Sequence, residues 1–271
     1  MDEQVALAAP ECPAVTYDTI HNTFEATIHD FMEKVDPDRT IPILYFIDPF
    51  GWKGIPFETI KGIMAQPKSE ILFVFMTYEM GRFLDSQFHE ESLSHLFNGD
   101  SWKIASRYTG EKRHETLVQL YEDLLKNETN VEYVWPFRVS DSFMRRTKYY
   151  IIYATHHFKG LRVMKNLMKG QGAGIFEYLG PDEERLRGQQ RFDAVDLGEW
   201  LKDRFKGRKV TFDELCEEVY PLSRSPVAEY IDSDYRKTIQ ALEKANDPQI
   251  EIIRVDSKKW GLKENDIIIF K

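Results

Sequence analysis

Length, composition and charge place broad limits on what this chain can be. Its 271 residues, of which 42% are hydrophobic and 30% charged, suffice for one large domain or for a medium domain with a small appendage. The net charge of -9 excludes a protein that coats nucleic acid by bulk electrostatics, so any nucleic-acid contact is expected to be focal.

Cysteine usage and the N-terminal residues predict a cytoplasmic protein. Cys12 and Cys216 lie far apart, and no Cys or His spacing suits a metal, so we expect two reduced thiols and no metal site. The first residues carry acids where a signal peptide needs positive charge, and no apolar run is long enough to span a membrane.

The stretch 42–52, PILYFIDPFGW, is the centre of the predicted fold. A preceding amphipathic helix, with Asn22 or Thr23 as its N-cap, is predicted to end before Asp36. The apolar run 43–47 is short and ends in Asp-Pro and Gly, which favours a central parallel strand buried on both faces over a buried helix. Because ligands of open α/β sheets bind beyond the carboxyl ends of such strands, Asp48 and Phe50 are the candidate site residues.

The next elements predict an α/β sheet with a hairpin. A helix over 55–64 and an apolar strand over 70–78 complete one βαβ unit. Helices are expected between 79 and 127. Aromatic strands over 131–139 and 149–155, joined by a polar connector, predict an antiparallel hairpin, and a helix follows over 160–168.

The C-terminal part has the pattern of a winged helix. We divide the chain into an α/β domain (1–180), a charged linker (181–192) and a small domain (193–271). Three helices over 197–205, 212–220 and 232–244 precede two short apolar strands over 250–255 and 267–270. This order is the winged-helix variant of the helix-turn-helix.

Four stretches carry a resemblance to a known family: FIDPFGWKGIPFETI, EILFVFMTYEMGRFLD, YVWPFRV and RRTKYYIIYATHHFKGLRVMK. Together they resemble the three-Cys-motif partner family, which is similar to class I S-adenosylmethionine-dependent methyltransferases. The resemblance implies a Rossmann-like, mostly parallel sheet with a C-terminal antiparallel hairpin, often followed by a winged helix. It also implies S-adenosylmethionine as cofactor and a three-Cys-motif protein as partner.

The resemblance further implies roles for the turn after the central strand. Asp48-Pro49-Phe50-Gly51 is similar to the DPPY or DPPF loop of methyltransferases. There the Asp accepts hydrogen bonds from the amine to be methylated, and the aromatic residue stacks on a flat substrate. From the residues alone, Asp48 could instead be only a turn former at the strand end, and for Phe50 and Trp52 a packing role is about as well supported as a stacking role.

The cofactor-binding half of that fold is missing from the sequence. No strand followed by a Gly-rich turn precedes residue 43, and GQGAG at 170–174 follows a helix instead of a strand. The strand at 43–47 is then a long apolar sheet edge that needs cover. Residues 14–20, a second copy, or a separate polypeptide that supplies the missing half are the alternatives.

Basic side chains suggest where phosphates bind. Arg138, Arg145 and Arg146 flank the hairpin, and Lys258 and Lys259 lie near the tip of the C-terminal ribbon. For Arg145 and Arg146 a solvated loop is an equal alternative. Residues 193–271 hold slightly more acids than bases, so this part is as suited to protein contact or dimerisation as to DNA.

Two functions remain open from the sequence. The first is an S-adenosylmethionine-dependent methyltransferase-like protein that methylates an amine on or near nucleic acid and needs a missing half or a partner. The second is a non-catalytic interaction or scaffold protein whose winged helix binds a protein partner or DNA.

Overall fold

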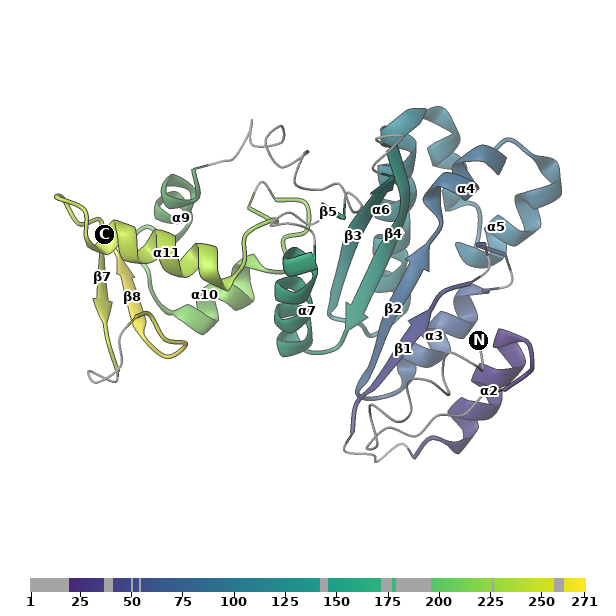
Figure 1. Cartoon of the computed structure of the whole chain (residues 1–271), viewed down its shortest axis with the longest axis horizontal. Coiled ribbons are helices and arrows are strands. Elements are labelled where there is room, and N and C mark those ends of the chain that lie inside the picture. Colours follow the sequence, from purple (N-terminus) through teal and green to yellow (C-terminus); the bar gives the residue numbers. More distant parts are fainter. Residues whose placement is uncertain are drawn as a thin grey trace.

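The computed structural model describes residues 20–36, 41–49, 51–53, 55–141, 146–171, 177–178, 196–225, 227–255 and 261–271. The larger sheet has five strands, and Figure 1 shows helices on both of its faces and a smaller group of C-terminal elements beyond one face. The helix α7 (Phe158–Gln171) lies between the sheet and this C-terminal group.

The larger sheet is mixed. Its strands are β1 (Ile43–Ile47), β2 (Ser69–Phe75), β3 (Tyr133–Asp141), β4 (Arg146–Thr155) and β5 (Glu177–Tyr178), in the order β1-β2-β4-β3-β5. β1 pairs parallel with β2, and β3 pairs parallel with β5. β4 runs antiparallel to both of its neighbours. Four strands, β1, β2, β3 and β5, thus run in one direction and β4 runs against them, which agrees with the predicted mostly parallel sheet and its antiparallel β3–β4 hairpin.

The helices between the first strands and the hairpin cover one face of the sheet (Figure 1). They are α3 (Phe57–Ala65), α4 (Thr77–Phe83), η1 (Gln87–His89), α5 (Glu90–Leu96), η2 (Ser101–Arg107) and α6 (Gly110–Glu128), with α2 (Phe24–Lys34) packed outside α3. Leu117, Tyr121 and Leu125 recur at helical spacing on α6 and are fully buried. The Tyr121 ring lies 4.6 Å from Phe75 and 6.2 Å from Phe57, so it joins the sheet to α3.

α7 covers the opposite face over β3 and β4 and carries a buried lysine. The Nζ atom of Lys165 lies 3.8 Å from the centre of the Trp135 ring on β3 and 4.4 Å from that of Tyr220. It donates hydrogen bonds to the carbonyl oxygens of Tyr220, at 3.3 Å, and Ala228, at 3.1 Å. Two ring faces and two carbonyl groups thus replace water around this ammonium group.

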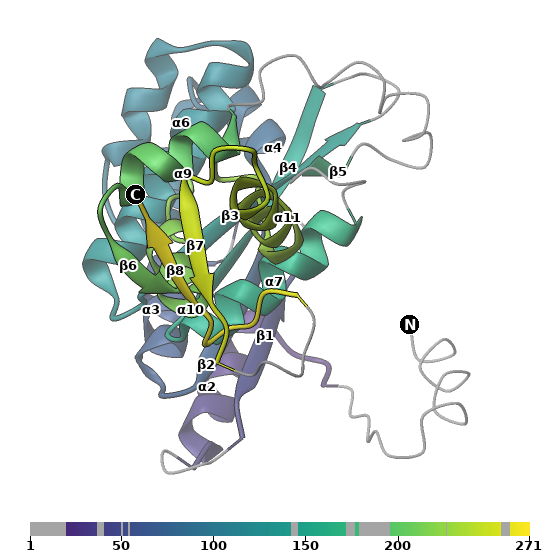
Figure 2. The ribbon, with the colours of Figure 1, turned by 90° about the vertical axis from the view of Figure 1, so that its left-hand side faces the viewer.

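The C-terminal group consists of α9 (Leu197–Phe205), β6 (Lys209–Thr211), α10 (Phe212–Val219), α11 (Asp232–Glu243), β7 (Ile250–Ile253) and β8 (Ile267–Phe270). Its sheet has the order β6-β8-β7 with antiparallel pairs, and α11 lies beside it (Figure 2). Capping explains two helix starts: the Asp196 side chain accepts from the first turn of α9, and Thr211 and Glu214 form a capping box on α10. The hydrophobic core of this group continues onto α7 and β3.

Three details differ from the sequence prediction. β1 is not buried on both faces, since Leu44 and Phe46 are 51% and 61% exposed, although its place at the edge of the described sheet agrees with the edge expected without the cofactor half. The second strand ends at Phe75, because Thr77 and Tyr78 already belong to α4. The small sheet has a third strand, β6, where a two-stranded ribbon was predicted.

Several of the sequence-based predictions concern residues outside the described ranges. These are Cys12, the covering segment 14–19, the GAG part of GQGAG and the linker 181–192. Cys216 is described and is a free, buried thiol, as expected. Among the described residues, no helix combines the length and apolarity needed to cross a bilayer.

Candidate functional site

Asp48 directly follows β1 at the carboxyl end of the parallel pair. Its side chain is exposed, as a group that binds an external ligand must be. Gly51 has a φ of 93°, which a residue with a side chain rarely adopts, and it turns the chain back toward α3. Trp52 is buried with its ring 5.7 Å from His89, so of its two predicted roles the packing role is the one observed. Phe50 lies outside the described residues.

Arg138 lies at the same end of the sheet, on β3, and it has a carboxylate partner. Glu111, in the first turn of α6, accepts a hydrogen bond from Arg138 at 3.3 Å. The same Glu111 oxygen accepts from the Thr147 hydroxyl at 2.5 Å and from the Tyr150 hydroxyl at 3.5 Å. An acid in a first helical turn is favoured by the helix dipole, so Glu111 is a stable centre for this cluster.

Arg146, at the start of β4, also has a protein partner. It donates to the Tyr78 hydroxyl at 2.6 Å, and its guanidinium carbon lies 4.2 Å from the centre of the Tyr78 ring. The imidazole of His114 also stacks with Tyr78, with the two ring centroids 6.3 Å apart. Burial lowers the pKa of His114, which favours a neutral ring at pH 7. Arg145 lies outside the described residues.

The contacts of the two arginines change their expected role. Both guanidinium groups are oriented by the protein, and Arg138 is in addition neutralised by Glu111. Binding of a phosphate to Arg138 would therefore have to compete with a carboxylate. Tyr78, Glu111 and His114 were not predicted from the sequence, since they come from α4 and α6 and meet the hairpin only in three dimensions.

A second feature is the apolar surface beside this site. Leu44 and Phe46 project from β1 on the face that α7 covers further along the sheet, because they share this face with Leu72 through the β1–β2 register. On α7, Val163 and Leu167 are exposed as well. A cavity of about 470 Å³ lies between α7 and the start of β2, and Val163 contributes to its wall.

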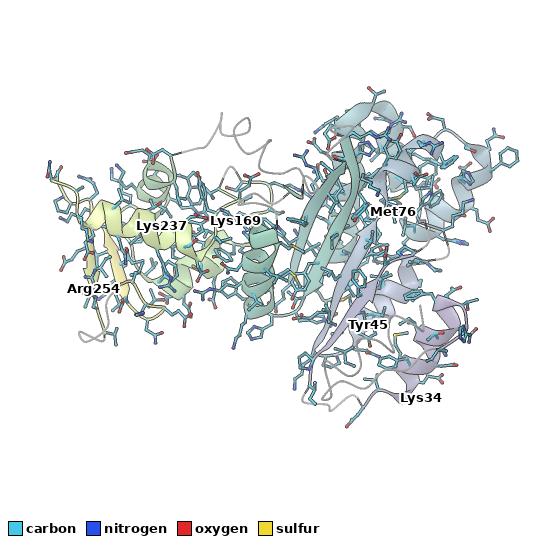
Figure 3. All side chains as sticks on the ribbon, in the orientation of Figure 1. Lys34, Tyr45, Met76, Lys169, Lys237 and Arg254 are labelled. Atoms are coloured by element: carbon cyan, nitrogen blue, oxygen red, sulfur yellow. The ribbon has the colours of Figure 1, made fainter. Side chains whose placement is uncertain are left out.

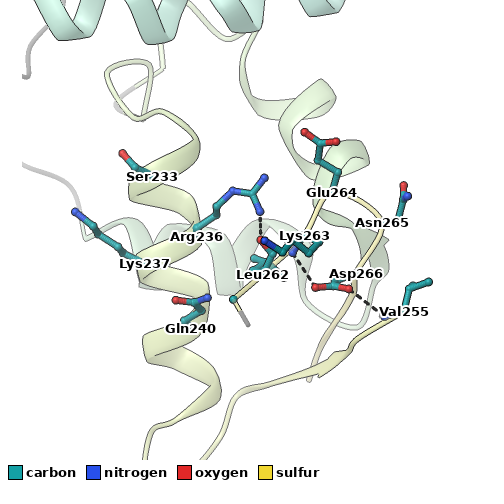
Figure 4. A pocket seen from close by; sticks show the side chains of 11 residues that line it. Ser233, Arg236, Lys237, Gln240, Val255, Leu262, Lys263, Glu264, Asn265 and Asp266 are labelled. Atoms are coloured by element: carbon teal, nitrogen blue, oxygen red, sulfur yellow. Dashed lines mark hydrogen bonds between the residues drawn. The ribbon is translucent and has the colours of Figure 1, made fainter. Parts of the chain in front are cut away.

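A third feature is a groove in the C-terminal group, shown in Figure 4. It measures about 770 Å³ and lies between α11 and the segment that leads into β8. Its lining residues are Ser233, Arg236, Lys237, Gln240, Val255, Gly261, Leu262, Lys263, Glu264, Asn265 and Asp266. Lys258 and Lys259, the predicted phosphate ligands of this region, lie outside the described residues.

The described residues lack the strand and Gly-rich turn by which the expected fold holds S-adenosylmethionine. Among them, no strand with a Gly-rich turn lies beside β1, where the cofactor half of the expected fold would be. In the same ranges, no group of three or more His, Cys, Asp or Glu side chains lies in position to hold a metal ion.

Comparison of the chain with protein-family models, curated proteins and solved structures returned no significant match. The resemblance to the three-Cys-motif partner family thus stays an expectation, and function has to be argued from the geometry.

Proposed function

We propose that this chain is the acceptor-binding half of a class I methyltransferase-like protein, and that it works only together with a second polypeptide that supplies the cofactor-binding half. The observation that carries this proposal is β1, an edge strand with exposed Leu44 and Phe46 that ends in Asp48. The roles proposed for this chain concern the acceptor alone, and the cofactor is assigned to the second polypeptide.

The finer fold is part of the same proposal. We infer a partial Rossmann-like sheet, supported by the parallel β1–β2 pair followed by the antiparallel β3–β4 hairpin. We infer a winged helix in the C-terminal group, supported by the order α9, β6, α10, α11, β7, β8 and by the sheet order β6-β8-β7.

The edge of β1 and the exposed side chains on its face are the proposed docking surface for the second polypeptide. The outer edge of β1, which pairs with no other strand of the described residues, offers backbone N–H and C=O groups to a further strand. Leu44 and Phe46 offer an apolar face to a helix that would pack beside α7, against Val163 and Leu167. Burying an exposed Phe or Leu side chain stabilises an interface by about 1.5 to 3 kcal/mol, so these groups favour association.

The proposed chemistry of this half is positioning. Asp48 accepts a hydrogen bond from the acceptor amine and orients its nitrogen, and Phe50 stacks on the flat group that carries the amine. Arg138 and Arg146, oriented by Glu111 and Tyr78, form the rim of the site. Orientation of this kind lowers the barrier of a transfer without a covalent intermediate on the protein.

The test is the Asp48→Ala variant in the assembly purified from the native cells. We expect methyl transfer to fall by at least about 100-fold, as for loss of an orienting contact, while the affinity for S-adenosylmethionine stays the same. Asp30→Ala, which removes an exposed carboxylate from α2, is the matched control and should keep full activity. Unchanged turnover in Asp48→Ala would disprove the role of Asp48.

A non-catalytic interaction protein is the second candidate. It is favoured by the protein partners that Arg138 and Arg146 already have, because these contacts leave the guanidinium groups less available to a substrate. In that case β1 would still bind a partner, but the assembly would not bind S-adenosylmethionine. Cofactor binding by the assembly therefore separates the two candidates.

A further inference from the structure

The acids of α11 are neutralised within the protein. Asp232 accepts from the Arg162 guanidinium group at 3.0 and 2.5 Å. Asp234 accepts from Lys169 at 2.6 Å, and Lys169, labelled in Figure 3, reaches from α7 to α11. A carboxylate with a cation in contact adds little to the potential at a distance, so these two acids do not make the outer face of α11 negative.

The third acid of the helix has a partner as well. Glu243 accepts two hydrogen bonds of 2.7 Å from Arg254, the residue that follows β7. Arg254 is therefore not available to an external phosphate. The charge of α11 that remains directed to solvent is that of Lys237 and Lys244, which are exposed.

These lysines belong to one stripe of the helix. Ser233, Lys237, Gln240 and Lys244 follow one another at intervals of three or four residues, so they lie on one face of α11. Ser233, Lys237 and Gln240 line the groove of Figure 4. The ammonium group of Lys237 makes no hydrogen bond or ion pair with any of the described residues.

The opposite wall of the groove adds a second cation. Lys263 is exposed, and its ammonium group has no partner among the described residues. This wall also carries two carboxylates: Glu264 is exposed and lies 3.6 Å from Arg162, which it shares with Asp213 and Asp232, whereas Asp266 is buried and accepts from the backbone N–H groups of Val255 and Lys263. Arg236 donates to the carbonyl of Leu262 and so holds the wall against α11.

We propose that this groove binds the sugar–phosphate backbone of a nucleic-acid duplex, with Lys237 and Lys263 on phosphates and α11 along the duplex. Lysines together with the hydroxyl and amide groups of Ser233, Gln240 and Asn265 are the donors that contact phosphate in protein–DNA complexes. A single strand, which binds by base stacking, is the alternative that the test separates from the duplex. This inference does not depend on the catalytic proposal, since the groove is built from the C-terminal group alone.

The three acids of α11 bear on whether this helix can contact nucleic acid. From the sequence, Asp232, Asp234 and Glu243 count against a nucleic-acid contact. In the structure each of these acids contacts an arginine or lysine of the protein, so the charged side chains left exposed on the helix are Lys237 and Lys244, although the chain carries a charge of -9.

The test is the fluorescence anisotropy of a labelled DNA duplex of mixed sequence with the full chain. We expect binding that weakens as salt rises between about 50 and 200 mM. The logarithm of the association constant should fall against the logarithm of the salt concentration with a slope near -0.9 for each phosphate contact. Lys237→Gln combined with Lys263→Gln should weaken binding at least about 10-fold and reduce the slope by about 2. Lys209→Gln, an exposed lysine on β6 outside the groove, is the control and should bind like the original chain.

Three results would overturn the inference. They are no duplex binding at low salt, equal binding by the groove variant and its control, and tighter binding of the corresponding single strand. An acidic protein ligand is the competing partner, and it is probed with polyglutamate. If polyglutamate displaces the duplex at equal charge concentration, the groove is an acidic-peptide site and not a duplex site. None of these results bears on whether the assembly binds S-adenosylmethionine.

Discussion

Gly160 decides how closely α7 can approach the sheet. A Cβ atom at this position would lie 2.5 Å from a Glu70 carboxylate oxygen, 2.7 Å from the Tyr153 hydroxyl and 2.8 Å from the Thr155 hydroxyl. Tyr153 and Thr155 are buried on β4, and Thr155 is hydrogen-bonded to Glu70, so the three groups cannot all move away. A glycine inside a helix is normally unfavourable, and here the close contact explains its presence.

Gly160→Ala is therefore expected to destabilise the protein by about 1 to 3 kcal/mol, the range for overpacking a buried site. Gly62→Ala on α3 is the matched control, because its Cβ would only touch the flexible Met32 side chain at 3.5 Å. There we expect a gain of about 0.5 to 1 kcal/mol from helix propensity. Urea unfolding of both variants measures the difference, and a stabilised Gly160→Ala variant would contradict the packing described for α7.

Lys165 links stability to pH. Burial lowers its pKa from the ordinary 10.5 to about 7, and the nearby charge of Lys169 acts in the same direction. Between about pH 7 and pH 10.5 the unfolded chain binds more protons than the folded protein. The free energy of unfolding therefore rises with pH in this range. Below pH 7 both states are protonated, and the cost of the buried charge is fully present.

We expect the free energy of unfolding to increase between pH 7 and pH 9, by at most about 1.4 kcal/mol for each pH unit from this group. Above pH 9 the buried Cys216 acts in the opposite sense, because burial raises its pKa. Lys165→Met, measured by denaturant titration at both pH values, should remove the increase. The same increase in the variant would show that the titrating group is a different one.

At the scale of elements, Arg162 connects α7 to the C-terminal group. Its side chain is only 13% exposed and contacts Asp232 on α11 and Asp213 on α10, the latter at 2.5 Å. Arg162→Ala would leave the partly buried Asp232 without its main cation, which should destabilise the protein by about 2 to 4 kcal/mol.

The control for Arg162 is Lys103→Ala. Lys103 contacts Glu90 at 2.5 Å and Asp100 at 2.9 Å, but all three groups are exposed. Exposed pairs are screened by solvent, so this variant should change the free energy of unfolding much less than Arg162→Ala. Equal losses in the two variants, measured by thermal unfolding, would mean that α7 is not fastened by Arg162.

The accuracy of the sequence prediction for each element depends on whether its signals are local. The bounds of α9 are predicted correctly, because Asp196 caps the helix and apolar residues recur along it. The position of β1 is predicted, but its burial is not, since an apolar run does not say which face another element covers. The three-residue strand β6 has too short a pattern to be recognised, and it exists because β8 pairs with it.

For the candidate site, too, the sequence predicts only the features that have a local signal. Asp48 could be singled out from the sequence because it directly follows an apolar strand. The contacts of Arg138 with Glu111, and of Arg162 with Asp213 and Asp232, join residues that are far apart in the chain. No local pattern contains such pairs, so the charge distribution on α11 had to come from the structure.

At the scale of the whole molecule, two surfaces leave binding groups unused. One is β1, with its free edge and the exposed side chains of Leu44 and Phe46. The other is the groove between α11 and the segment before β8. They lie on different groups of elements, and α7 holds these groups together (Figure 1). A partner on β1 and a nucleic acid in the groove are thus independent expectations for one molecule.

The central claim is that this chain acquires a cofactor site only with a second polypeptide on β1. Its most direct test is calorimetric titration with S-adenosylmethionine, at two temperatures, of the isolated monomer and of the assembly purified from the native cells. We predict a dissociation constant of about 1 μM, or roughly -8 kcal/mol, for the assembly, and no saturable binding to the monomer. Binding of the same strength to the monomer, or no binding to either sample, would contradict the claim.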